Sequence, residues 1–356
     1  MKHSMRIFVL TAMFAFLAGH LNAQFVTSHA KIAMPGQQRG IYYSLPRTVI
    51  QLDLMVDKTE LVEGPYSEYA NMVGADEVIT SDQIEYALRD VVMSTYAEAD
   101  PNATFFVASN PKKPEPMQFH LNSRGILEGI GMIAKNSPLQ SMPVSLAKAN
   151  VSSDNTPVFK YQFGPSGAKS EELRARAAAE MINRIREEKL KLLTGFQETA
   201  FSLDTYRQMY ADLDEMESEY LSLFVGKRVV TPIVQTVYVT LSKEVPLQTV
   251  GSFSKETGFS TSISEGNSIT VQAISLKTTG NINALSKSAV ESISHEDKVF
   301  YRIPEIVNVK VSLDDELLLE RRETLVQFGV FMLAPLNNTK MVFDPNTGQV
   351  VSISME

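Results

Sequence analysis

The chain has 356 residues, contains no cysteine and no tryptophan, and carries a formal net charge of −8. This length is sufficient for two or three domains with proper hydrophobic cores. The absence of cysteine excludes disulfides, thiolate catalysis and thiolate zinc sites, so packing alone must stabilise the fold. An acidic chain is poorly suited to nucleic acid or to anionic membrane surfaces, and we expect neither as a main partner.

Residues 1–23 have the pattern of a secretory signal peptide. Two cations form the basic start, residues 7–17 the apolar centre, and Leu21-Asn22-Ala23 the cleavage-type end. The apolar run is too short to span a membrane, and no other long run exists in the sequence. We therefore expect an exported chain that begins near Gln24, in the periplasm or associated with the outer membrane. Without cysteine it is not a lipoprotein.

Residues 169–226 are predicted to form an antiparallel helical hairpin around which the rest of the chain is organised. Apolar residues recur at spacings of three and four in both halves, as on the buried face of an amphipathic helix. Ser170 and Ser202 mark the two helix starts, and Gly195 and Gly226 the two ends. The first helix is rich in Arg and Lys and the second in Asp and Glu. Opposite charge favours antiparallel pairing, although each exposed pair contributes only about 0–1 kcal/mol.

The acidic run of the second helix is interpreted as a solvated face. Carboxylate metal sites in helical bundles usually include Glu-x-x-His, and the hairpin contains no histidine.

The sequence on either side of the hairpin is rich in strand and turn signals and predicts an α+β protein with two β-rich, sandwich-like lobes. We divide it into a loose lead, a first β-rich lobe, a Ser-, Pro- and Asn-rich linker, a middle β region that carries the hairpin between strands, and a C-terminal β-rich lobe. These segments cover residues 24–39, 40–135, 136–157, 158–297 and 298–356.

Two strands, a turn between them and a hairpin are predicted within the first lobe. Residues 83–97 and 104–108 have strand composition and are separated by Asp100-Pro101-Asn102, a turn signal. Residues 119–130 predict a hairpin that turns at residues 122–125.

The C-terminal lobe repeats motifs of the first lobe in the same order. The aligned pairs are 41–49 with 299–307, 105–108 with 331–334, and 119–125 with 343–348. Tyr43 and Pro46 thereby correspond to Tyr301 and Pro304. Three matches in one order favour an internal duplication, although aromatic strands with Asn-Gly turns also recur by chance.

Eight residues form a candidate interaction or structural motif: Tyr43, Pro46, Tyr66, Tyr69, Tyr220, Phe224, Tyr301 and Pro304. Proline in a strand marks a bulge or a sheet edge, and an edge accepts a partner strand. An anchored strand entry is the structural alternative, and base rates favour it. The aromatic residues of the second helix are interpreted as hairpin core in preference to a docking patch.

Residue types that carry catalysis are scarce. His120 and His295 are the histidines well inside the mature chain, and neither lies in a Gly-x-Ser-x-Gly or His-Asp arrangement. Asp314 and Asp315 resemble glycosidase acids in type only, since Asp-Asp pairs at strand ends are mostly turns. The glycines of residues 125–131 give a weak dinucleotide signal. We predict no catalytic residue, no cofactor and no metal.

Several motifs resemble a family of uncharacterised secreted or envelope proteins of Bacteroidota, described only as a domain of unknown function. The motifs that carry this resemblance include Tyr43-Ser44-Leu45-Pro46-Arg47-Thr48, Gly64-Pro65-Tyr66-Ser67-Glu68-Tyr69-Ala70, Glu219-Tyr220-Leu221-Ser222-Leu223-Phe224-Val225-Gly226-Lys227, Tyr301-Arg302-Ile303-Pro304, Gln327-Phe328-Gly329 and Phe343 to Gly348. The resemblance implies a cell envelope with two membranes and transfers no catalytic residue.

Our leading hypothesis is a non-enzymatic envelope protein that uses its β-rich lobes and projecting hairpin for contacts with partner proteins. Two alternatives stay open: a periplasmic hydrolase of peptide or glycan, and a small-ligand binder that uses a cleft between the lobes.

Overall fold

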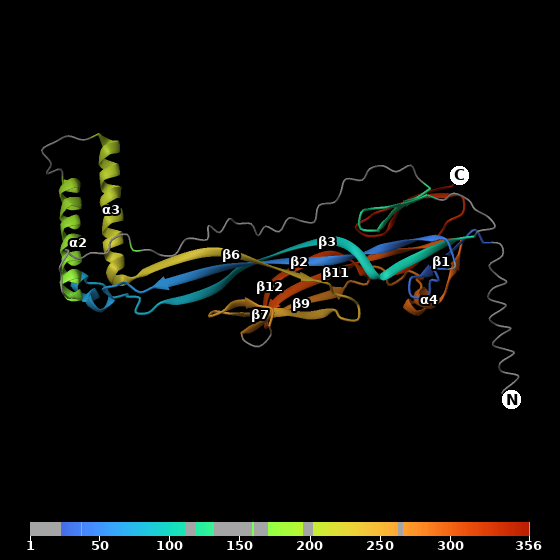
Figure 1. Ribbon diagram of the computed structural model, residues 1–356, viewed down its shortest axis with the longest axis horizontal. Coiled ribbons are helices and arrows are strands. Elements are labelled where there is room, and N and C mark those ends of the chain that lie inside the picture. Colours follow the sequence, from blue (N-terminus) through green and yellow to red (C-terminus); the bar gives the residue numbers. More distant parts are fainter. Residues whose placement is uncertain are drawn as a thin grey trace, which may run out of the picture.

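The computed structural model describes residues 23–36, 38–110, 118–131, 159, 170–194, 202–262 and 266–355. The protein is elongated, with two helices side by side at one end and β-sheets along the rest of its length (Figure 1). It is β-rich and of the predicted α+β class. None of the described helices is long and apolar enough to cross a membrane. The predicted linker and nearly all of the predicted signal lie outside the described residues.

The strands of the described residues form three antiparallel sheets. The first sheet has the order β10-β1-β3-β2-β6, with bounds His295–Glu296, Phe25–His29, Gln83–Ser109, Gly40–Val62 and Lys227–Val239. The second has the order β12-β11-β9-β7-β8, with bounds Glu316–Pro335, Lys298–Leu313, Asn267–Ser275, Leu247–Ser254 and Gly258–Ser260. The third has the order β14-β13-β5-β4, with bounds Val350–Met355, Thr339–Phe343, Leu127–Ile130 and Phe119–Leu121.

The first and second sheets pack face to face over one hydrophobic core. On β2, Ile50, Leu52 and Leu54 alternate with polar residues, so one face of the strand is apolar, and all three are fully buried. They meet Val309 of β11 and Val271 of β9 from the second sheet. Strand alternation therefore produces the sandwich that the sequence predicts.

A second core lies near the other end of the first sheet, where the third sheet also contributes. Its centre is a stack of rings: Phe105 lies 4.4 Å from Phe300 and 5.5 Å from Tyr43, measured between ring centroids. Leu127 of β5 and Met341 of β13 are buried in the same core. One core thus joins strands from both ends of the sequence.

The pairs β2–β3 and β11–β12 are two long β-hairpins, and each contains a bulge at the corresponding place. On one side of the bulge the inward-facing side chains belong to the core between the first two sheets, and on the other side they belong to the core around Phe105. In β2, Leu45 lies opposite residues 100–103 of β3; in β11, Pro304 lies opposite residues 326–329 of β12. The predicted break at Asp100-Pro101-Asn102 is therefore a bulge within a continuous strand. This common irregularity supports the internal duplication, which stays a prediction.

Reciprocal hydrogen bonds fasten the two long hairpins to each other at these bulges. Thr48 N donates to Gln327 Oε1 and Gln327 Nε2 donates to Thr48 O, both at 2.9 Å. Gln327 Nε2 also donates to Leu241 O. Tyr43 Oη accepts from Phe300 N at 2.9 Å and donates to Phe300 O at 3.3 Å. All these groups are buried or partly buried. Each hydrogen bond therefore satisfies polar atoms that would destabilise the core if they had no partner.

The helical hairpin consists of α2 (Glu171–Thr194) and α3 (Leu203–Val225), paired antiparallel as predicted. Ser202 Oγ caps α3, and Gly226 ends it directly before β6. Lys189, buried in the helix interface, donates to Asp214 and Glu217 at 2.7 Å.

The base of the hairpin packs on η2 (Ser67–Val73), the 3-10 helix between β2 and β3. The rings of Tyr66 and Phe224 lie tilted against each other there, with centroids 5.6 Å apart and an interplanar angle of 54°. Tyr66 N also donates to Leu223 O at 2.8 Å. The connection that joins β2 to β3 therefore supports the helices.

Two features of the predicted domain division need correction. The lead of residues 24–39 is not loose throughout, because β1 pairs with β3 and β10, and Asp297 Oδ1 accepts hydrogen bonds from Gln24 N and Phe25 N. The segments 40–135 and 298–356 are not separate lobes, because β13 of the second pairs with β5 of the first within the third sheet. Short strands of both segments need each other as neighbours to satisfy their backbone groups.

We predict that Gly329→Ala destabilises the fold through the β12 bulge. A Cβ at Gly329 would lie 2.0 Å from Ile303 O, a backbone atom that cannot rotate away. We expect the free energy of unfolding to fall by about 1–3 kcal/mol in urea denaturation, the usual cost of overpacking. Gly36→Ala is the matched control, since nothing lies within 4 Å of its Cβ position. Equal stability of the two variants would contradict the close contact at the bulge.

Candidate functional site

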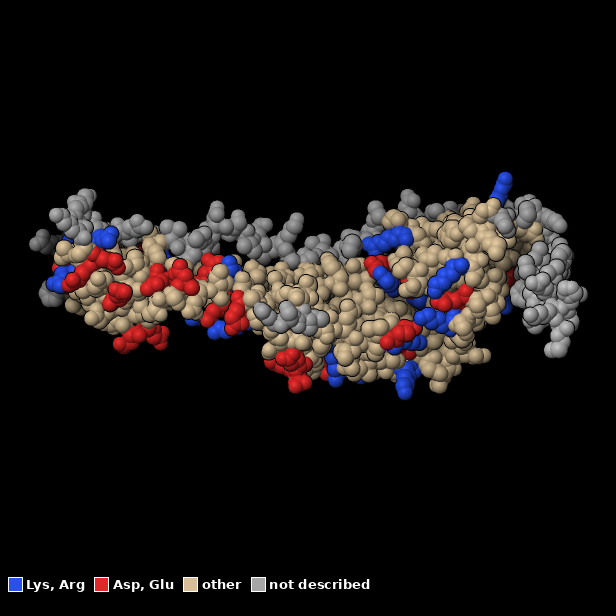
Figure 2. Space-filling view, turned by 60° about the horizontal axis from the view of Figure 1, so that its bottom comes forward, with Lys and Arg blue, Asp and Glu red and all other residues tan. Residues whose placement is uncertain are grey.

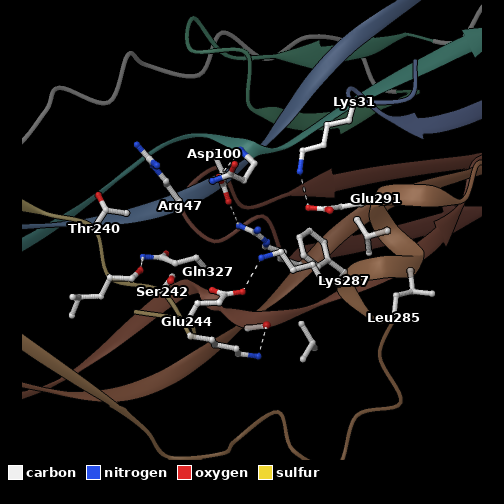
Figure 3. A pocket seen from close by; sticks show the side chains of 18 residues that line it. Lys31, Arg47, Asp100, Thr240, Ser242, Glu244, Leu285, Lys287, Glu291 and Gln327 are labelled. Carbon is white, nitrogen blue, oxygen red and sulfur yellow. Dashed lines mark hydrogen bonds and ion pairs between the residues drawn. The ribbon is translucent and has the colours of Figure 1, made fainter. Parts of the chain in front are cut away.

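A pocket of about 370 Å³ lies where the two long hairpins are joined (Figure 3). Both bulges contribute to its wall, together with the segment between β6 and β7 and the short helix α4 (Lys287–Ser292). The lining residues are Lys31, Arg47, Asp100, Asn102, Thr240, Leu241, Ser242, Lys243, Glu244, Leu285, Lys287, Val290, Glu291, Arg302, Gln327, Gly329, Val330 and Phe331.

A buried ion pair forms the floor of this pocket. Arg302 of β11 donates through Nη1 to Asp100 Oδ2 at 2.7 Å and to Pro46 O at 3.1 Å. The side chains of Arg302 and Asp100 are only 7% and 4% exposed. The guanidinium carbon also lies 4.4 Å from the ring centroid of Phe331. Burial lowers the pKa of Arg302, and the charge of Asp100 opposes this shift. Breaking such a pair by removing one partner is costly, because the other charge stays buried.

Two further ion pairs lie at the rim. Lys31 Nζ lies 3.0 Å from Glu291, and Lys287 Nζ lies 2.8 Å from Glu244. The hydrogen bond from Lys287, with donors of residues 242–244, lowers the pKa of Glu244 to about 2. Both pairs are solvated, so their ionisation matters more for the charge of the pocket than for stability.

The loop before α4 is held in place by a buried carboxylate. Glu305, 2% exposed, accepts hydrogen bonds from the amide and hydroxyl groups of both Thr278 and Thr279. Burial alone would raise the pKa of Glu305, but these four hydrogen bonds outweigh it and lower the pKa to about 2. The loop carries Leu285 into the pocket wall, so Glu305 positions one side of the pocket.

The eight residues of the predicted motif do not form one site. Tyr66, Tyr69, Tyr220 and Phe224 belong to the hydrophobic core at the base of the helical hairpin. The core that contains Phe105 holds Tyr43, fully buried, with Tyr301 packed against it.

Pro46 and Pro304 lie at the two bulges, one of the two placements that strand proline predicts. The carbonyl oxygen of Pro46 accepts a hydrogen bond from Arg302, a residue of the pocket.

The candidate catalytic groups lie apart from the pocket. His295 is in β10, with its ring against Phe300, and burial lowers its pKa. His120 is in β4 opposite Gly129. Asp314 has a positive φ of 47° and forms the turn between β11 and β12, as predicted for an Asp-Asp pair. Across the described ranges, no cluster of three or more histidine or carboxylate side chains is arranged to hold a metal ion.

Sequence reasoning missed the pocket because its residues come from distant segments. Two signals existed. Arg302 and Glu305 are charged residues within the otherwise apolar run of residues 299–307, where a buried charge requires a partner. The second signal is Asp100-Pro101-Asn102, which the sequence predicts as a break between strands. The sequence alone does not show that Arg302 is the partner of Asp100.

The comparisons with known proteins identify one family. A family model described as Domain of unknown function (DUF4831) matches residues 39–351. No curated protein and no solved structure gives a significant match.

We predict that Glu305 makes the protein acid-sensitive. Its pKa rises from about 2 in the folded protein to about 4.5 when unfolded, so its stabilisation is complete above pH 4.5 and is lost as pH falls toward 2. Glu305→Gln should lower the free energy of unfolding at pH 7 by about 1–3 kcal/mol and weaken its dependence on pH in this window. Urea denaturation from pH 2.5 to 7 measures both effects.

Glu256→Gln, at an exposed turn between β7 and β8, is the matched control and should leave both quantities unchanged. A Glu305→Gln variant with the wild-type pH profile would show that the four hydrogen bonds do not hold the loop.

Proposed function

The chain belongs to the family described as Domain of unknown function (DUF4831), and we propose that it is a non-enzymatic scaffold protein of the bacterial cell envelope. It would act through contacts with partner proteins, and the helical hairpin would be its main contact element. The position of the hairpin carries this proposal.

The hairpin lies at one extreme of an elongated molecule (Figure 1). Its two helices pack on each other and on η2, and α3 continues into β6 after a single glycine. Most of the length of both helices therefore stays clear of the sandwich. A helical pair that buries so little against the rest of the described chain presents a large surface to other molecules.

The surface of the hairpin combines apolar and acidic groups. Leu190 and Leu193 near the end of α2, and Leu203 at the start of α3, are each more than 60% exposed. Figure 2 shows acidic side chains gathered over this end of the molecule. Exposed leucines on a hairpin that also carries carboxylates suit a partner surface that combines apolar and basic groups.

The predicted export signal supports the envelope as the site of action. The predicted signal ends at Ala23, and the residues that follow enter the fold at once, because β1 begins at Phe25. Cleavage after Ala23 would place the new N-terminus beside Asp297, whose carboxylate accepts the Gln24 amide. N-terminal sequencing of protein purified from the periplasm or outer membrane should therefore begin near Gln24. Recovery of uncleaved chain from the cytoplasm would contradict export.

A photo-crosslinking amino acid placed at Leu190 or Leu193 tests the proposed contact in the cells that make the protein. We expect both positions to give the same discrete adduct, identified by mass spectrometry. Leu247 and Leu317 are the matched controls, since they are 51% and 50% exposed but lie on strands of the second sheet. These positions should not give that adduct.

The identified partner then allows a direct measurement. Leu190→Asp combined with Leu193→Asp should weaken its affinity for the purified protein at least about tenfold, because exposed apolar anchors carry much of the energy of an interface. Adducts from the control positions alone, or no adduct from any position, would contradict a scaffold that works through its hairpin.

A further inference from the structure

We propose that the pocket between the two bulges binds a small organic monocarboxylate with an apolar body, with Arg302 as the anchor of the carboxylate. This site lies on the β structure, away from the helical hairpin, and does not depend on the scaffold function. Two sources supply such chemistry: a free amphipathic acid and the C-terminal residue of a peptide.

The size of the pocket fits a small ligand. Its volume of about 370 Å³ lies toward the lower end of the range in which proteins bind small molecules, about 300–1,000 Å³. Its walls come from both long β-hairpins, from the β6–β7 segment and from α4, so it is built by the fold rather than by one loop.

The guanidinium of Arg302 has an unused hydrogen-bonding edge at the pocket. Both of its hydrogen bonds leave from Nη1, and within the described residues Nε and Nη2 form none. The Arg302 side chain is only 7% exposed, and neither nitrogen is among the fully buried atoms that lack a partner, so this edge is open to a molecule that occupies the pocket. The planar fork of a guanidinium matches the two oxygens of a carboxylate, and Phe331 holds the plane from one side.

The charge around this edge selects a single negative charge. Of the cations in the lining, Lys31, Lys287 and Arg302 face carboxylates that also line the pocket. Arg47 pairs with Glu98, which is outside the lining. This leaves Lys243, whose ammonium donates to Gly329 O and has no carboxylate partner among the described residues.

One cation in excess attracts a monoanion. A phosphate dianion would meet the three carboxylates of the lining, Asp100, Glu244 and Glu291, and is therefore disfavoured.

An apolar wall adjoins the charged groups. Leu285 and Val290 come from the α4 region, and Val330 and Phe331 from β12. Burying a side group of a few carbons against them increases the affinity, because apolar surface is removed from water. Together with a charge-assisted hydrogen bond, this predicts dissociation constants of roughly 0.01–1 mM for a fragment-sized acid.

Isothermal titration calorimetry with 3-phenylpropionate and hexanoate, and with 3-phenylpropionamide as the uncharged analogue, tests the site in the intact protein. We expect both acids to bind and the amide to bind at least about tenfold more weakly. Inorganic phosphate should not bind measurably. A short peptide ending in Phe, with a free or an amidated C-terminus, distinguishes the two sources. Binding of the free-ended peptide at least as tight as that of the acids identifies a peptide end, and weaker binding identifies a free acid.

Three variants locate the binding. Arg302→Lys keeps the charge but removes the fork, and should weaken binding of 3-phenylpropionate at least about tenfold. Val330→Phe fills the apolar part of the pocket without touching a charge and should have a similar effect, which protects the test if Arg302→Lys fails to fold. Lys287→Ala removes a rim cation and should weaken binding about threefold or more.

Lys255→Ala is the matched control for the rim. The side chains of Lys255 and Lys287 are 66% and 65% exposed, and each ammonium pairs with a glutamate, at 2.9 Å and 2.8 Å. Lys255, however, lies just after β7 and outside the lining of the pocket. It should change the affinity less than about twofold. No binding of either acid at about 10 mM, equal binding of acid and amide, or unchanged affinity in the folded pocket variants would overturn the proposal.

Discussion

The structure depends on the joint between its two long β-hairpins. Each hairpin has a bulge at which its inward-facing side chains pass from one hydrophobic core to the other, and a bulge leaves backbone groups without strand partners. Gln327, in the β12 bulge, bonds to both backbone groups of Thr48, which lies just beyond the residues of β2 that pair with β6. Arg302 bonds to the carbonyl of Pro46, beside the β2 bulge. The bulges interrupt the pairing of the strands, and side chains at the bulges also join the two hairpins. The pocket lies between the two bulges.

The parts of the fold that the sequence predicts are those with local causes. The helical hairpin follows from apolar spacing, a serine cap and glycine stops, all within residues 169–226. The turn at Asp314 follows from two adjacent aspartates. The arrangement of the strands does not follow, because β1 lies between β10 and β3, and β5 pairs with β13. Such pairings join segments far apart in the chain, and strand composition does not encode which neighbour each strand selects.

The site shows the same division. Asp100-Pro101-Asn102 and Pro304 predict local irregularity, and the structure has bulges there. That the two bulges face each other, and that Arg302 reaches Asp100 across them, is a result of tertiary packing. The most distinctive aromatic residues of the sequence, such as Tyr43 and Phe224, are core residues. Large buried rings are distinctive in a sequence because they fix packing, whereas the pocket is lined by ordinary charged residues whose significance depends on position.

The direction of the long strands has a mechanical consequence. β2 contains 23 residues and spans about 75 Å at the usual rise of a strand, nearly parallel to the long axis of the molecule (Figure 1). Over its second half it is bonded to β6, which leads directly from α3. A pull on the helices along this axis would load the backbone hydrogen bonds between β6 and β2 in shear. These bonds would then bear the force together, instead of breaking one after another. Tension at the helical end would therefore be transmitted to the opposite end with little extension.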